Sequence, residues 1–151
     1  MDVDIFLNDR VELLKRMISI PSISREENQL ADFLEVVLKE KNYRPWRKGN
    51  NIWLTTPEWN DQKPTILLNS HIDTVKPVAG WTKDPFSPHE EEGKLFGLGA
   101  NDAGASLVSL LQAFMILTQT QQENNFFFWL PVKKKYRGKM VSNLFCLNCR
   151  R

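Results

Sequence analysis

The residues best suited to chemistry form two short polar clusters, and the first is His71-Ile72-Asp73. It comes directly after the apolar residues 65–70. A histidine at this place can offer one ring nitrogen to a metal ion, and a carboxylate two residues later can accept the N–H of the other nitrogen. Such a bond selects the tautomer and raises the basicity of the ligand. The alternative is a capping or loop histidine without a ligand role, because the His-x-Asp pattern is common.

The second cluster surrounds Asp102, which lies between glycines at Gly97, Gly99 and Gly104. Glycines let the backbone approach another group closely, and one carboxylate can use its two oxygens to bridge two cations. The alternative is an ordinary helix cap, in which the helix dipole stabilises an aspartate at the first turn. Taken singly, each cluster leaves its alternative open.

The elements that must position these clusters alternate between helix and strand, which predicts an α/β layered domain. A helix is expected from a cap at Asn8 to Pro21, which ends it. A second helix is expected to open with the capping box Ser24 and Glu27. Strands are predicted near residues 43–47, 51–55, 65–70 and 94–98, and a loop over 77–92. A third helix is expected from the apolar face formed by Leu107, Leu110, Leu111, Phe114 and Leu117.

The predicted strand at residues 65–70 is a short apolar run that ends in the polar residues Asn69 and Ser70. A short continuous apolar run is typical of a strand buried on both faces of a sheet. In open α/β sheets, ligand sites gather at the carboxyl ends of the strands. His71 stands at such an end, so the strand would deliver it to the site.

Length and composition fit one globular domain, with 151 residues, 42% hydrophobic and 25% charged. The start is too acidic for a signal peptide. The longest apolar run, near residues 107–117, is interrupted by Ser109 and Gln112 and falls short of the roughly 20 residues of a membrane span. We therefore expect a cytoplasmic protein without a membrane partner.

Charge divides the chain into two parts. Residues 1–118 hold 13 Lys and Arg against 17 Asp and Glu, whereas residues 119–151 hold 7 against 1. Both cysteines, Cys146 and Cys149, lie in the second part, and a lone C-x-x-C pair is weak evidence for a zinc or redox site. We predict a catalytic-domain segment over 1–118 and an aberrant basic tail over 119–151.

Taken together, four segments resemble a known family. Their order is Met17-Ile-Ser-Ile-Pro-Ser-Ile-Ser24, then Asn69-Ser-His-Ile-Asp-Thr-Val75, then residues 81–86, then Gly93-Lys-Leu-Phe-Gly-Leu-Gly-Ala-Asn-Asp102. This order is similar to that of the zinc-dependent deacetylases and exopeptidases, which include acetylornithine deacetylase, succinyl-diaminopimelate desuccinylase and aminoacylase. Leu98 departs from the family, where many members have arginine, and so does the Ala103-Gly104 pair.

The resemblance implies the incomplete N-terminal part of a three-layer αβα zinc-hydrolase domain. It implies that His71 binds one zinc ion, that Asp73 orients His71, and that Asp102 bridges two zinc ions. Cobalt or manganese can occupy such a site. The implied substrate is a small N-acyl amino acid, closest to acetylornithine and hence to arginine biosynthesis, and the parent would be a homodimer that binds no nucleic acid.

The family's catalytic glutamates are expected after Asp102, but Lys133-Lys134-Lys135 stands where they should be. A shift of reading frame near Phe126-Phe127-Phe128 converts these lysine codons to glutamate codons when permitted codons are chosen. We therefore predict that the tail is a frameshift product, that residues 129–151 have no selected fold, and that the sheet lacks a central strand.

Three functional interpretations follow. The first is a metal-dependent hydrolase of an N-acyl amino acid, truncated before its glutamates. The second is a catalytically inert fragment, since a catalytic zinc needs about three protein ligands. The third is a basic-tailed module that binds nucleic acid or acidic surfaces, which no recognition motif supports. His89 and the acidic run Glu90-Glu91-Glu92 are interpreted as a solvated surface.

Overall fold

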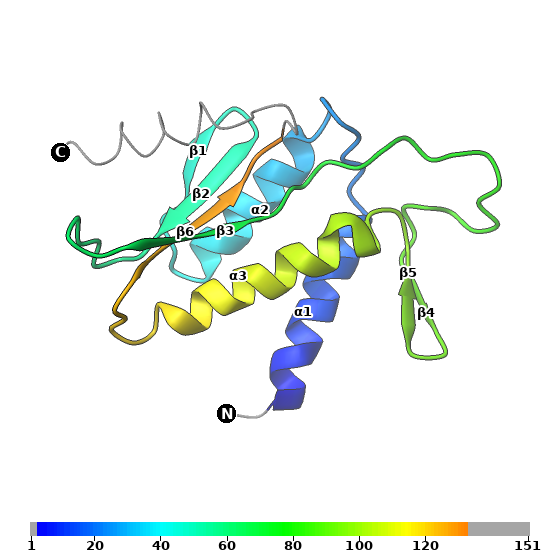
Figure 1. Cartoon of the computed structure of the whole chain (residues 1–151). Coiled ribbons are helices and arrows are strands. Elements are labelled where there is room, and N and C mark those ends of the chain that lie inside the picture. The colour runs from blue at the N-terminus through cyan, green and yellow to red at the C-terminus, as the bar shows by residue number, and fades with distance from the viewer. Residues whose placement is uncertain (1–2, 133–151) are drawn as a thin grey trace.

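The computed structural model describes residues 3–132 as helices packed on one face of a mixed sheet (Figure 1). The described helices are α1 (Val3–Ile18), α2 (Asn28–Glu40) and α3 (Ala105–Leu117), with a single irregular turn, η1 (Ala100–Gly104), directly before α3. The strands are β1 (Trp46–Lys48), β2 (Asn51–Thr55), β3 (Thr65–Asn69), β4 (His89–Glu91), β5 (Lys94–Phe96) and β6 (Asn125–Leu130).

The main sheet has the order β1-β2-β6-β3. β6 is antiparallel to β2 and parallel to β3. All six residues of β6 are buried. The expectation that the sheet lacks a central strand is therefore wrong, because the apolar sequence of β6, including Trp129 and Leu130, supplies one. The predicted boundary at residue 118 falls between α3 and β6, although these two elements pack against each other. The part of the predicted basic tail beyond residue 132 lies outside the described residues.

β3 is less buried than its apolar sequence predicts. Ile66 and Leu67 are 42% and 39% exposed. Within residues 3–132, β3 pairs only with β6 and forms an edge of the sheet. The prediction that residues 65–70 form a strand is confirmed. The prediction that this strand is buried on both faces is wrong, because Ile66 and Leu67 are exposed.

The main core lies between the sheet and the three helices. Phe128 of β6 and Phe114 of α3 are fully buried, with ring centroids 5.9 Å apart. Period-2 alternation along β6 sends Phe127 and Trp129 to the opposite face, where they cluster with Trp53 of β2. Figure 1 shows α1, α2 and α3 on the same side of the sheet.

The helices begin at other residues than predicted. α1 begins at Val3, so Asn8 lies inside it. α2 begins at Asn28 and has no side-chain cap. The predicted capping box is wrong because its two side chains bond elsewhere: the Ser24 hydroxyl donates to Asp73, and the Glu27 carboxylate accepts the backbone N–H of Arg25. α3 ends at Leu117, as predicted.

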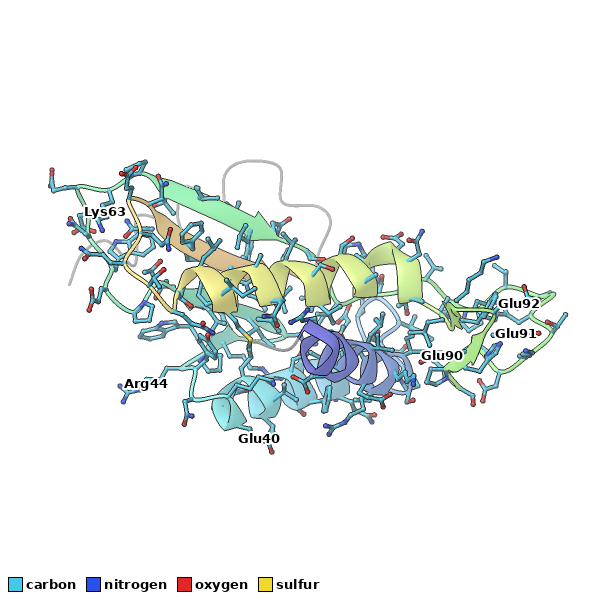
Figure 2. The ribbon with its side chains drawn as sticks, turned by 90° about the horizontal axis from the view of Figure 1, so that it is seen from below. Glu40, Arg44, Lys63, Glu90, Glu91 and Glu92 are labelled. Atoms are coloured by element: carbon cyan, nitrogen blue, oxygen red, sulfur yellow. The ribbon has the colours of Figure 1, made fainter. Side chains whose placement is uncertain are left out.

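Residues 77–92, expected to be a loop, contain β4, which pairs with β5 in a separate two-stranded hairpin. The hairpin turns through Glu92 and Gly93, both with positive φ, as the tight turns of two-residue hairpins require. Figure 2 shows Glu90, Glu91 and Glu92 together on this hairpin, well apart from Glu40 at the end of α2.

By length and composition, one helical stretch among residues 3–132 could cross a membrane. It covers Ala100–Leu117, with a mean hydropathy of 1.3. The core helix of a soluble protein meets the same criterion, and α3 buries Leu107, Val108, Leu111 and Phe114 in the main core.

Candidate metal centre

His71 lies just past the carboxyl end of β3, where the sequence predicts it. Its ring Nδ1 is 3.1 Å from the backbone oxygen of Asp73 and 3.2 Å from Asp73 Oδ1. Both possible acceptors of the Nδ1 proton thus come from the same residue. A proton on Nδ1 leaves Nε2 with a lone pair, which is the form that binds a metal ion.

Asp73 is buried, with 7% of its surface exposed. Its Oδ2 accepts a hydrogen bond of 2.6 Å from the Ser24 hydroxyl. Its other oxygen faces His71 Nδ1. The carboxylate therefore stands behind the imidazole, on the side away from Nε2, which is the arrangement that orients a metal-binding histidine.

Asp102 reaches the other side of the same imidazole. Its Oδ1 lies 3.1 Å from His71 Nε2, although 31 residues separate the two in sequence. Unlike Asp73, its side chain is 77% exposed. It belongs to the irregular turn η1, in which its backbone has φ −117° and ψ 94°, outside the helical range. The simple helix-cap alternative therefore does not describe Asp102.

Two glycines allow η1 to pack this closely. Gly99 has φ +79°, and a Cβ there would lie 2.7 Å from Thr74 Cγ2. A Cβ on Gly104 would lie 2.6 Å from Leu14 Cδ1 and 2.7 Å from the Gly99 carbonyl oxygen. Both contacts are closer than real Cβ atoms tolerate. These glycines are therefore needed to bring Asp102 up to the loop that carries His71.

The facing atoms of His71 and Asp102 fit a shared metal ion. Two ligands bound at about 2.0–2.1 Å in a tetrahedral zinc site stand roughly 3.3 Å apart. The observed separation of Nε2 and Oδ1 is 3.1 Å. Imidazole and carboxylate together also suit zinc and its neighbours in the first transition series.

The described residues supply only part of such a centre. Among residues 3–132, no group of three or more His, Cys, Asp or Glu side chains could hold a metal ion. His71 and Asp102 alone fall short of the three protein ligands that a catalytic zinc usually has.

The remaining histidine and the acidic run lie on the β4–β5 hairpin. The ring of His89 stacks on Phe96 with centroids 5.1 Å apart. Glu90 and Glu91 are exposed and pair with Lys15 and Lys83, each at 2.8 Å. The interpretation of this run as a solvated surface agrees with its exposure.

Sequence reasoning missed Ser24. It interpreted this residue as a helix cap, whereas the structure places its hydroxyl on Asp73, 49 residues later. The segment Met17–Ser24 was part of the family resemblance, and that was the one signal that connected Ser24 to the site. Periodicity and capping rules act locally and say nothing about a contact at this separation.

Residues 67–130 match the family described as peptidase family M20/M25/M40. The chain is 29% identical over 112 residues to succinyl-diaminopimelate desuccinylase of Anaplasma marginale (strain Florida), covering 71% of this chain and 29% of the relative. It is 28% identical over 126 residues to the enzyme of the same name from Coxiella burnetii (strain RSA 331 / Henzerling II), covering 79% and 33%. The chain thus spans no more than a third of these relatives.

Solved structures support the fold. The di-peptidase Dug1p from Saccharomyces cerevisiae gives a TM-score of 0.67 at 19% identity, covering 95% of this chain and 36% of that one. The M20 family metallo-carboxypeptidase Sso-CP2 from Sulfolobus solfataricus gives 0.66 at 20% identity, covering 86% and 30%. The predicted α/β class is confirmed, and these neighbours share the fold of the described residues.

Proposed function

We propose that the chain carries one half of a binuclear zinc centre, in which His71 and Asp102 are ligands and Asp73 orients His71. The observation that supports this most is that Nε2 of His71 and Oδ1 of Asp102 face each other at 3.1 Å. Asp102 would also be a ligand of the second ion. Cobalt or manganese can replace zinc.

When bound, zinc would supply Lewis-acid polarisation of an amide carbonyl and a water molecule with a pKa near about 7. The residues of this chain have positioning roles. Asp73 keeps the Nδ1 proton on its own side of the imidazole, so that the Nε2 lone pair points toward Asp102. The exposed Asp102 carboxylate keeps the site open toward solvent, from which a substrate must enter.

We propose that the substrate class of the intact protein is an N-acyl amino acid, with acetylornithine as the first candidate. The desuccinylase names of the relatives support an N-acylated, carboxylate-bearing substrate in general. They make N-succinyl-diaminopimelate the second candidate. Hydrolysis of both compounds by the intact protein distinguishes a deacetylase from a desuccinylase.

We propose further that the 151-residue chain alone is inactive as a hydrolase. Its described part contributes two ligands rather than three, and the glutamate that the resemblance implies as general base is replaced by lysine in the run Lys133–Lys135. A general base must lie within hydrogen-bond reach of the water that it deprotonates. A protonated lysine cannot accept that proton.

Isothermal titration with Zn²⁺ and Co²⁺ tests the ligand assignment. We expect weak binding by the wild-type chain, loss of that binding in His71→Ala and in Asp102→Ala, and no change in His89→Ala, which is the matched histidine control. Equal heats for wild type and His71→Ala would overturn the assignment. Turnover of acetylornithine by the wild-type chain, abolished by His71→Ala, would instead overturn the proposed inactivity.

Sequencing of the coding DNA across residues 126–135 tests the proposed frame shift. An altered T run that restores consecutive glutamate codons would support it. A clean reading whose codons do not permit the shift would contradict it and make the basic tail a genuine part of the protein.

A further inference from the structure

The connection between α1 and α2 runs beside the loop that carries the candidate site. The backbone N–H of Thr74 donates to the Ser22 carbonyl at 2.8 Å, and the N–H of Ser24 donates to the Thr74 carbonyl at 3.0 Å. Ile23 and Thr74 form a parallel bridge. These two backbone hydrogen bonds make up the bridge and hold the two segments together without any side chain.

The Ser24 side chain makes an additional and different contact. Its Oγ lies 2.6 Å from Asp73 Oδ2 and 3.4 Å from the Thr74 carbonyl oxygen. A hydroxyl has one proton to donate. The shorter distance and the negative charge of the carboxylate favour Asp73, since hydrogen bonds from hydroxyls to ionised acceptors are short and strong.

The Asp73 carboxylate is held by a hydrogen bond at one oxygen and lies beside the imidazole with the other, while the hydrogen bond of His71 Nδ1 goes to the Asp73 backbone oxygen. Oδ2 is bound by Ser24, and Oδ1 faces His71 Nδ1 at 3.2 Å. Rotation of the carboxylate about its own axis would move Oδ1 away from the imidazole. The bond from Ser24 opposes this rotation, because it fixes the second oxygen in place.

We propose that Ser24 is a positioning residue for the metal ligand His71 and that it acts through Asp73. This inference rests on the proposed function only where metal affinity is concerned. The chain Ser24–Asp73–His71 extends the support of the ligand by one residue beyond the carboxylate. Partners of this kind typically change metal affinity about 10–100-fold when removed.

The test compares Ser24→Ala with Ser24→Thr, which keeps the hydroxyl. Ser24 is exposed, so the additional methyl group of threonine can be accommodated in solvent. Ser109→Ala is the matched control, because the Ser109 hydroxyl bonds only the backbone of its own helix, at Ala105. All variants are made in the full 151-residue chain, and a thermal melt of each shows that it is folded.

The first readout is the ¹⁵N NMR spectrum of the His71 ring in the metal-free chain. We expect Ser24→Ala to lower the population of the Nδ1–H tautomer, and both Ser24→Thr and Ser109→Ala to keep the wild-type spectrum. A ring spectrum of Ser24→Ala identical to that of wild type overturns the proposal.

The second readout is Co²⁺ affinity by titration calorimetry. We expect an affinity about 10–100-fold weaker in Ser24→Ala and near wild type in Ser24→Thr. If His71→Ala leaves the Co²⁺ affinity of the chain unchanged, the proposed function fails. The role of Ser24 is then decided by the ring spectrum alone, so the two failures are distinguishable.

Discussion

Asp73 and Asp102 approach one imidazole from opposite sides, and they are held there in opposite ways. The side chain of Asp73 is 8% exposed and is bound by a hydroxyl from another segment. The side chain of Asp102 is 77% exposed, and its place is set by the backbone of η1, which glycines allow to pack closely. The difference predicts that the fold depends on Asp73 much more than on Asp102.

The largest expected loss of stability comes from the core residue Phe128, which supports the strand that leads to His71. Phe128 is fully buried and pairs with Leu68 of β3, three residues before His71. Phe128→Ala should cost about 3–5 kcal/mol of unfolding free energy, because it leaves a cavity between sheet and helices. Urea unfolding measures this cost. A cost below that of Asp73→Ala would show that β6 is not the support we assign to it.

The next effect concerns the packing of the Asp102 side. Gly104→Ala should destabilise the fold by about 1–3 kcal/mol, because the new methyl would meet Leu14 and the Gly99 carbonyl oxygen. Gly104 has φ −58°, so alanine carries no backbone strain there and its cost comes from the contacts alone. If Gly104→Ala leaves the thermal melt of the chain unchanged, the close approach of η1 is not limiting.

The two carboxylates themselves give the sharpest contrast. Asp73→Ala should cost about 1–3 kcal/mol, because it removes the buried acceptor of the Ser24 hydroxyl, although the backbone oxygen of residue 73 still faces His71 Nδ1. Asp102→Ala should stay within about 0.5 kcal/mol of wild type, as exposed substitutions do. Both should weaken Zn²⁺ binding. Equal losses of stability would contradict the division of roles between the two residues.

The smallest expected effect is a control on a carboxylate outside the site. Hydrogen bonds from Lys39, and then from Arg47, lower the pKa of Glu35 below its usual value. The carboxylate therefore contributes stability above the unfolded-state pKa of about 4.3, and this contribution is lost as the pH falls through the lower folded-state pKa.

Glu35→Gln should accordingly cost less than about 1 kcal/mol at pH 7, where the wild type has its full contribution. The difference between the two proteins should shrink below pH 4. Urea unfolding of both at pH 7 and pH 3 measures it. A difference that grows toward low pH would show that the lysine and arginine contacts are not the cause of the shift.

Local patterns predicted several elements well, and long-range pairing explains where they failed. The apolar spacing from Leu107 to Leu117 and the strand pattern at 51–55 led to α3 and β2 because each element satisfies its own period. The cap at Asn8 failed because α1 already begins at Val3. The box at Ser24 and Glu27 failed because Ser24 bonds the distant Asp73 and Glu27 bonds the backbone of Arg25. The sequence predicted β3 as a strand, but it did not predict that β3 lies at an edge of the sheet, since this depends on its pairing with β6.

By itself, the sequence determined the α/β class and the two polar clusters, because hydrophobic period and glycine placement are local properties. It also marked His71 and Asp73 as a pair, since two residues at this spacing can meet without help from the fold. Only the tertiary structure decided that β6 enters the sheet between β2 and β3 and that Ser24 holds Asp73. It also decided that Asp102 lies 3.1 Å from His71 Nε2. These are contacts between segments far apart in the chain, and they form only when the core brings those segments together.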